Sequence, residues 1–228
     1  MIEFLLLDLD DTILDFLKSE DYGIRKTLRE AGVEPTDEVC ARYSQINKGF
    51  WKRLELGEVT RDQLNVGRFQ QLFEELGVTG DAVRCAETYM ENLSSVHFFL
   101  PGAEEAIKRL HKKYRLFIVS NGTASTQHRR LTSADLYPYF EKVFISEIVG
   151  VNKPDKVFFD RCFAQIPGFD PQKALIVGDS LSSDIKGGKN AGIRTCWVNP
   201  KHKTAPEELR PDYEIETLSQ LEALLETI

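Results

Sequence analysis

Short apolar runs that alternate with helical segments are the feature of this sequence that most constrains its fold. Five runs are clear and a sixth is weaker, and they occupy residues 2–9, 114–121, 142–146, 173–179, 194–199 and 212–216. Apolar and polar residues do not alternate cleanly within them, which is typical of strands covered on both faces. Segments with helical character lie between them, at residues 101–113, 154–166 and 182–193. This order predicts an α/β fold with a doubly wound, Rossmann-like parallel sheet.

Residues 17–97 form a long insertion after the first strand and contain no convincing strand. An apolar stripe at helical spacing runs through Leu64, Phe69, Leu72, Phe73 and Leu76. The stretches "GVEPTDE" and "GVTGDA" read as breaks between helices. We therefore expect a discontinuous α/β core, made of residues 1–16 and 98–228, with an all-helical domain at residues 17–97.

Composition excludes several classes of protein. The chain is 42% hydrophobic and 29% charged, as globular proteins are, and its net charge of −7 with no long basic run argues against nucleic acid as a partner. No apolar run approaches the roughly 20 residues of a membrane span, and the acidic N-terminus is unlike a signal peptide. The four cysteines lack metal-binding spacing, and Cys162 and Cys196 lie among apolar residues as buried free thiols would. We expect a cytoplasmic protein.

Polar side chains follow four of the predicted strands at the point where each strand ends. Asp8 and Asp10 follow the first, within an acidic group that includes Asp11 and Asp15. Further along the chain the strand ends are followed by Ser120-Asn121-Gly122, by Lys153 and by Asp179. In a doubly wound sheet, ligands bind at the carboxyl ends of the strands, so these side chains are expected to meet at one edge.

Carboxylates that gather in this way repel one another unless a cation shares them. Asp8, Asp10 and Asp179 could supply oxygens to Mg²⁺, which prefers a few carboxylates, several waters and a phosphate oxygen. Lys153 and Ser120 offer a positive charge and a donor to a phosphoryl group. Asp8 would then attack phosphorus to form an aspartyl-phosphate, and Asp10 would protonate the leaving oxygen and activate water.

The four motifs "DLDDT" (8–12), "SN" (120–121), "K" (153) and "GDSLSSD" (178–184) resemble, in order, those of the haloacid dehalogenase (HAD) superfamily of phosphohydrolases. The resemblance covers the whole chain, since the helical insertion is similar to the cap of that superfamily. It implies Asp8 as nucleophile and Asp10 as acid/base, with metal bound by Asp8, Asp179 and the backbone carbonyl of Asp10. It also implies phosphate binding by Ser120, Asn121 and Lys153, and support of the metal site or of Lys153 by Asp184.

The chain also resembles one branch of that superfamily, the bacterial pyrimidine 5′-nucleotidases. The matching stretches include "INKGFWKRLELGEVTRDQL" and "GRF" in the insertion, and "SNG", "ISEIVGVNKPD" and "AGIRTCWVNP" in the core. The implied substrate is a pyrimidine nucleoside monophosphate such as UMP, dUMP or dTMP. In the cap, Asn47 and Trp51 share a helix face, and with Arg68 they are the candidates for reading the base.

Plainer interpretations stay open for each residue. Asp8 and Asp10 could cap a helix and a turn, Ser120 could belong to a turn, and Lys153 could be a surface lysine. Asp184 could stabilise the first turn of a helix, and Trp51 and Arg68 could be a core residue and a surface ion-pair partner. Three functions compete with nucleotide hydrolysis: dehalogenation, hydrolysis or mutase chemistry on small sugar phosphates, and a non-catalytic binding or regulatory role. The second acid Asp10 and the pair Asp179 and Asp184 favour phosphoryl chemistry over dehalogenation.

Overall fold

The computed structural model describes residues 1–228, and the chain divides into two compact units. The core unit consists of residues 1–16 and 97–228, and the helical unit of residues 17–96. The expected boundary at residue 97 differs from this one by a single residue, because His97 falls in the core unit.

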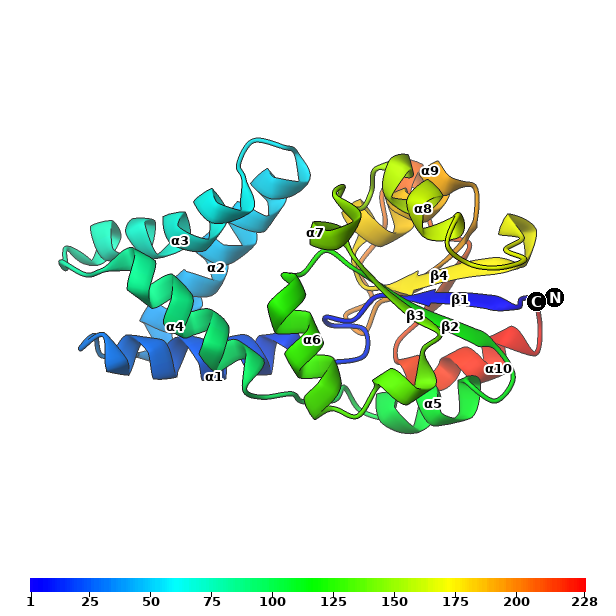
Figure 1. Ribbon diagram of the computed structural model, residues 1–228, viewed down its shortest axis with the longest axis horizontal. Coiled ribbons are helices and arrows are strands. Elements are labelled where there is room, and N and C mark those ends of the chain that lie inside the picture. The colour runs from blue at the N-terminus through cyan, green and yellow to red at the C-terminus, as the bar shows by residue number, and fades with distance from the viewer. The chain divides into compact units, whose positions relative to one another are not determined.

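A sheet of six parallel strands, in the order β3-β2-β1-β4-β5-β6, forms the centre of the core unit (Figure 1). The strands are β1 (Phe4–Leu7), β2 (Arg115–Ser120), β3 (Lys142–Ile145), β4 (Ala174–Gly178), β5 (Arg194–Val198) and β6 (Tyr213–Ile215). Each strand lies inside the run predicted for it, and the predicted α/β fold is confirmed. The first strand lies between β2 and β4, so the chain reverses its direction of winding there, and doubly wound folds bind ligands at such a point.

Helices cover both faces of this sheet, with α5 and α10 on one side and α8 and α9 on the other (Figure 1). The helices of the core unit are α5 (Ala103–Leu110), α6 (Ala124–Ser133), α7 (Ser146–Val149), α8 (Lys156–Phe163), α9 (Lys186–Ala191) and α10 (Leu221–Leu225). A π-helical turn, Leu181–Ile185, leads into α9. Alternate residues of β1 point to opposite faces, so Leu5 and Leu7 pack on the side of α5 while Phe4 and Leu6 pack on the side of α8. This two-sided burial explains why the strands read as continuous apolar runs.

The helical unit is built from four helices, and no strand lies between them in the sequence. They are α1 (Phe16–Glu30), α2 (Asp37–Glu55), α3 (Arg61–Leu76) and α4 (Ala82–Ser94). Their ends follow local chemistry: Thr36, Thr60 and Asp81 accept a backbone N–H at the starts of α2, α3 and α4, and Gly77 ends α3 in the left-handed conformation with φ of 64°. An aromatic cluster of Tyr43, Phe69, Phe73 and Tyr89 fills the interior.

Two further findings concern the chain as a whole. All four cysteines are free and buried, as expected for Cys162 and Cys196. No helix combines the length and the apolar character that crossing a lipid bilayer requires.

Candidate active site

A tight loop directly after β1 holds the acidic group of the N-terminal motif. The Asp8 N–H donates to the Val177 carbonyl at 2.9 Å, which extends the pairing of β1 with β4 by one residue. The Ile13 and Leu14 N–H groups then both donate to the Leu9 carbonyl at 2.9 Å and close the loop. The loop turns at Asp11, whose φ of 56° is a left-handed value that aspartate tolerates better than most residues. Asp8 thus lies at the carboxyl end of the central strand.

Three carboxylates from separate segments gather at this edge of the sheet. Asp8, Asp179 and Asp184 each present an oxygen, and these oxygens lie within 4.8 Å of one another. Asp179 follows β4 directly, and Asp184 comes from the π-helical turn behind it. The close approach of Asp184 depends on Gly178, because a Cβ there would lie 2.2 Å from Asp184 Oδ2. The strand ends therefore position the cluster, and the absence of a side chain at Gly178 gives it the space that it needs.

The buried ammonium group of Lys153 hydrogen-bonds to two of these three carboxylates. Lys153 is 1% exposed, and its Nζ donates to Asp8 Oδ1 at 2.7 Å, to Asp184 Oδ1 at 2.6 Å and to the Val119 carbonyl at 2.7 Å. These bonds use all three of its hydrogens. The reading of Lys153 as a surface lysine is therefore wrong, and so is that of Asp184 as a helix-turn partner alone.

The charges of this cluster do not balance. Burial raises the pKa of Asp8 to about 8, an effect that Lys153 opposes and that Asp184 and Asp10 increase. Burial also raises the pKa of Asp179 well above its usual range, and Asp184 and Asp8 add to the effect. Burial alone would lower the pKa of Lys153, but Asp184 and Asp8 outweigh burial and hold that pKa above its ordinary value. Three carboxylates with one ammonium form a donor set that fits a hard divalent cation such as Mg²⁺.

The residues that end β2 arrange donors beside this cluster. Ser120 Oγ accepts the Gly122 N–H at 3.1 Å and a Gln127 amide N–H at 2.9 Å, which leaves its own hydrogen to donate to another acceptor. The Asn121 side chain donates to the Lys153 carbonyl at 2.9 Å and accepts the Lys153 N–H at 2.8 Å. Asn121 therefore positions Lys153, a role that the sequence did not suggest, and direct phosphate binding by Asn121 stays a prediction.

The Asp10 carboxylate is bound by two residues of α6. Gln127 Nε2 donates to Asp10 Oδ2 at 2.6 Å, and the Arg130 guanidinium forms an ion pair with Asp10 Oδ1. The side chain of Asp10 is thus engaged elsewhere, while the expected metal contact of Asp10 was through its backbone carbonyl. Neither Gln127 nor Arg130 was singled out from the sequence. Their spacing of three residues just after the "SNG" motif, beside the core residue Leu131, was the one signal available.

The three candidates of the helical unit have different surroundings. Asn47 and Arg68 are each 2% exposed, and Arg68 donates to Asn47 Oδ1 at 2.9 Å. Asn47 in turn donates to Glu20 Oε1 at 2.6 Å. The reading of Arg68 as a surface ion-pair partner is therefore wrong. Trp51 is only partly buried, with the Arg61 guanidinium 5.9 Å from its ring centroid. Contact of any of the three with a substrate stays a prediction.

Comparison with known proteins yields both curated relatives and a solved structure. The chain is 40% identical to the HAD-hydrolase YfnB of Bacillus subtilis over 97% of this chain and 94% of that one. A crystal structure of YfnB bound to magnesium, which reveals interdomain movement, matches with a TM-score of 0.94 and 39% identity over 98% of both chains. The pyrimidine 5′-nucleotidase PynA of Streptococcus pneumoniae is 39% identical, over 96% of this chain and 93% of PynA. The pyrimidine 5′-nucleotidase YjjG of Escherichia coli is 33% identical, over 98% of this chain and 97% of YjjG.

A family model gives the same answer as the relatives. The model for haloacid dehalogenase-like hydrolases matches residues 2–192, a span that holds Asp8, Ser120, Lys153, Asp179 and Asp184 and also the helical unit. Because that match covers most of the chain and the relatives are similar over nearly their whole lengths, the protein belongs to the haloacid dehalogenase-like hydrolases.

Proposed function

We propose that this hydrolase is a Mg²⁺-dependent 5′-nucleotidase that removes phosphate from pyrimidine nucleoside monophosphates through an aspartyl-phosphate on Asp8. The observation that carries the reaction type is the buried contact between Lys153 Nζ and Asp8 Oδ1, 2.7 Å long, inside a group of three carboxylates. The pyrimidine substrate is supported by the similarity to PynA and YjjG, which are 39% and 33% identical to the chain.

Four residues of the site have distinct roles in this reaction. Asp8, whose one oxygen is fixed by Lys153, attacks phosphorus with the other. The Ser120 hydroxyl donates to a phosphoryl oxygen, and the Lys153 charge lies beside the nucleophile where negative charge develops. Asp10 protonates the oxygen that leaves with the nucleoside, and then takes a proton from the water that hydrolyses the aspartyl-phosphate.

Asp8, Asp179 and the backbone carbonyl of Asp10 would hold the metal, and Asp184 would keep both Lys153 and the cluster in place. A bound Mg²⁺ supplies positive charge that offsets the carboxylates and the incoming phosphate. Without a cation the three carboxylates share one ammonium and repel an anionic substrate. EDTA should therefore abolish hydrolysis of p-nitrophenyl phosphate and Mg²⁺ should restore it. Full activity in metal-free buffer would overturn the metal assignment.

The substrate is tested with a panel of nucleoside monophosphates and sugar phosphates assayed side by side. The highest kcat/KM is expected for UMP, dUMP or dTMP, and a sugar phosphate at the top would instead favour a sugar-phosphate phosphatase.

Trp51 is the residue of the helical unit we expect to read the base, because Asn47 and Arg68 are buried and bound to each other. Trp51→Ala should lower kcat/KM for the preferred pyrimidine nucleotide by about 5- to 150-fold, the cost of a lost buried contact of roughly 1–3 kcal/mol. Hydrolysis of p-nitrophenyl phosphate should change far less. Equal losses on both substrates would assign Trp51 a role in folding instead.

A further inference from the structure

One face of α6 carries two buried polar residues, Gln127 and Arg130, that contact Asp10 and that the family motifs do not include. We propose that Gln127 and Arg130 are positioning residues that hold the Asp10 carboxylate as the base for hydrolysis of the aspartyl-phosphate. This inference rests on the proposed function, in which Asp10 acts on both halves of the reaction.

The first support is that two of the three guanidinium nitrogens of buried Arg130 have no hydrogen-bond partner. Arg130 is 0% exposed, and its NH1 contacts Asp10 Oδ1 and, at 3.1 Å, Gln127 Oε1. Its Nε and NH2 are buried with no hydrogen-bond partner. Buried donors without partners destabilise a fold, and an apolar residue of similar volume would avoid that cost. Apart from Gln127 and the Phe16 ring, 5.9 Å from its guanidinium carbon, the partner that accounts for a charge at this position is Asp10.

The second support is that the two residues hold both oxygens of Asp10. Arg130 takes Oδ1, and Gln127 Nε2 takes Oδ2 at 2.6 Å. Both oxygens accept a hydrogen bond here, as the carboxylate form of the residue does, and this form can take a proton from water. Gln127 Nε2 also donates to Ser120 Oγ at 2.9 Å, so one amide joins the base to the proposed phosphate-binding hydroxyl.

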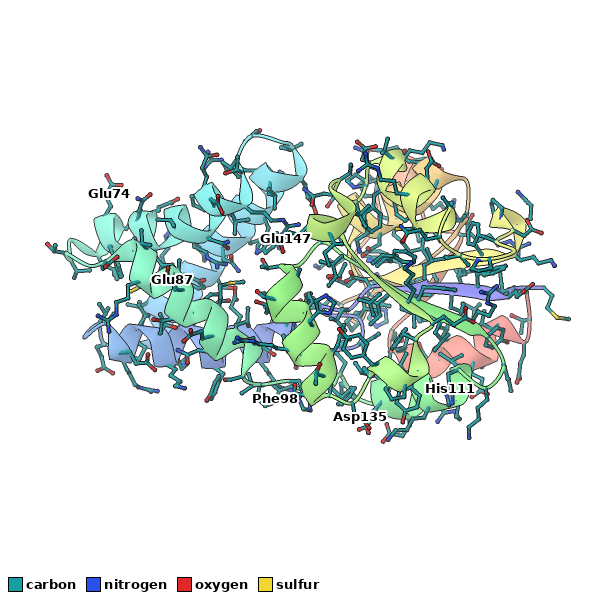
Figure 2. All side chains as sticks on the ribbon, viewed as in Figure 1. Glu74, Glu87, Phe98, His111, Asp135 and Glu147 are labelled. Atoms are coloured by element: carbon teal, nitrogen blue, oxygen red, sulfur yellow. The ribbon has the colours of Figure 1, made fainter.

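The third support is that the helix presenting these residues is anchored. At its start, the Ala124 N–H donates to a carboxylate oxygen of Glu147 at 2.6 Å, and Figure 2 labels Glu147 on α7. Further along, Leu131 is 0% exposed and packs in the main hydrophobic core. Gly122 leaves room for the Gln127 amide, because a Cβ there would lie 2.3 Å from Gln127 Nε2. Side chains held on a rigid element in this way are positioned more accurately than those on loops.

The step that depends on this arrangement is the second half of the reaction. Water attacks phosphorus, the bond between phosphorus and the Asp8 oxygen breaks, and the proton of water passes to Asp10. Orthophosphate leaves and Asp8 is regenerated as a carboxylate. Asp10 gives this proton to the leaving oxygen of the next nucleotide or, when the leaving group is p-nitrophenolate, releases it to solvent, so protons balance over one turnover.

The test uses p-nitrophenyl phosphate, because p-nitrophenolate is a stable anion and leaves without a proton. Formation of the aspartyl-phosphate then needs no acid, and its hydrolysis still needs the base. In Arg130→Met we expect kcat to fall at least about 10-fold, part of the roughly 10²- to 10⁴-fold that a general base contributes. KM should fall in proportion, kcat/KM should stay within about 3-fold, and a burst of p-nitrophenolate should approach one per enzyme.

Matched variants separate positioning from folding. Arg129→Met makes the same substitution one residue away, at an exposed position on the same helix, and should show no burst. Gln127→Met should show a smaller burst, and Arg130→Lys, which keeps one charged donor, should recover much of kcat. If Arg130→Met does not fold, Gln127→Met and Arg130→Lys still carry the test.

The results that overturn the inference differ from those that overturn the proposed function. A burst in Asp10→Asn with none in Arg130→Met or Gln127→Met would show that Asp10 is the base and needs no positioning by α6. Equal falls in kcat and kcat/KM without a burst would assign Arg130 to folding or to phosphoryl transfer. Retained activity in Asp8→Asn would overturn the covalent mechanism itself, and the inference with it.

Discussion

The two units of the chain both draw charged side chains out of water, but they balance the charges differently. The core unit gathers three carboxylates around one ammonium, those of Asp8, Asp179, Asp184 and Lys153. The helical unit buries one carboxylate and one guanidinium, of Glu20 and Arg68, at 4% and 2% exposure. An uncharged amide, that of Asn47, links the two by hydrogen bonds of 2.6 and 2.9 Å.

This difference in charge balance distinguishes the candidate site of the core unit from the structural hydrogen-bond network of the helical unit. Burial raises the pKa of Glu20, but hydrogen bonds from Ser44 and Asn47 and the charge of Arg68 oppose that shift. The set is closed, because each charge has a partner inside the same unit. In the core unit burial raises the pKa of Asp8 to about 8 even with Lys153 in contact. A cluster that lacks positive charge is stable only with a further cation or a proton, and we therefore propose this cluster as the place where a ligand binds.

The largest effect that tests this comparison is expected from Asp8→Asn. Asparagine has nearly the same shape but is a far poorer nucleophile, so turnover of p-nitrophenyl phosphate should vanish while the fold remains. Asp135→Asn is a matched control, because Asp135 is an exposed residue of the core unit with a φ of 50° that asparagine also tolerates (Figure 2). Activity of Asp8→Asn near that of Asp135→Asn would mean that the unbalanced cluster is not the catalytic centre.

The next largest effect is expected from Arg68→Met in the helical unit. Loss of the guanidinium leaves Asn47 Oδ1 without its donor and removes the positive charge that offsets Glu20. The free energy of unfolding should therefore fall by roughly 1–3 kcal/mol, the cost of a buried polar group that has lost its partner. Urea unfolding measures this change. The control is Arg84→Met, which makes the same substitution at an exposed position of α4 and should leave the free energy of unfolding unchanged. Unaltered stability in Arg68→Met, with a selective loss of nucleotide hydrolysis, would instead return Arg68 to the substrate-binding residues.

The third effect, the smallest when taken per pH unit, is a dependence of stability on pH in metal-free protein. Asp8 has a pKa of about 8 in the folded chain, against 3.8 for an unperturbed aspartate, so the folded chain keeps a proton that the unfolded chain releases. This contribution to stability is complete below the lower pKa and is lost as pH rises through the higher one. The free energy of unfolding should therefore fall by up to about 1.4 kcal/mol per pH unit for one proton.

Urea midpoints measured in EDTA between about pH 5 and pH 9 would show this slope, and Asp8→Asn should flatten it. An equal slope in the wild type and in Asp8→Asn would assign the dependence to other groups.

The core strands could be predicted because the residue types within each strand indicate that the strand is buried. A strand covered on both faces is apolar at every position, and β1, β2 and β4 consist almost entirely of such residues. The breaks of the helical unit were equally readable, because Thr36, Gly77 and Asp81 are local signals for the ends of helices. Asp8, Lys153 and Asp179 could be placed together because parallel strands end at one edge of a sheet.

Polar residues that are buried by pairing with one another could not be predicted in the same way. Arg130 pairs with Asp10 although the two are 120 residues apart in the sequence, and nothing near either residue indicates the other. From the sequence, Arg68 and Asn47 were candidates for contact with a substrate, but in the structure Arg68 donates a hydrogen bond to Asn47. Such partners depend on tertiary packing, which composition and periodicity do not record.

The strand order has a consequence for how the chain is made. Phe4 pairs with Arg115 on one side and with Ala174 on the other, so β1 needs partners that leave the ribosome more than a hundred residues later. The aromatic interior of the helical unit, by contrast, forms between residues that are less far apart in the sequence, such as Tyr43 with Phe69 and Phe69 with Tyr89, and contacts of shorter sequence separation form faster. The helical unit can therefore fold while the first strand is still an exposed apolar segment. Asp8, although among the first residues synthesised, acquires its neighbours Lys153, Asp179 and Asp184 only after Asp184 has emerged.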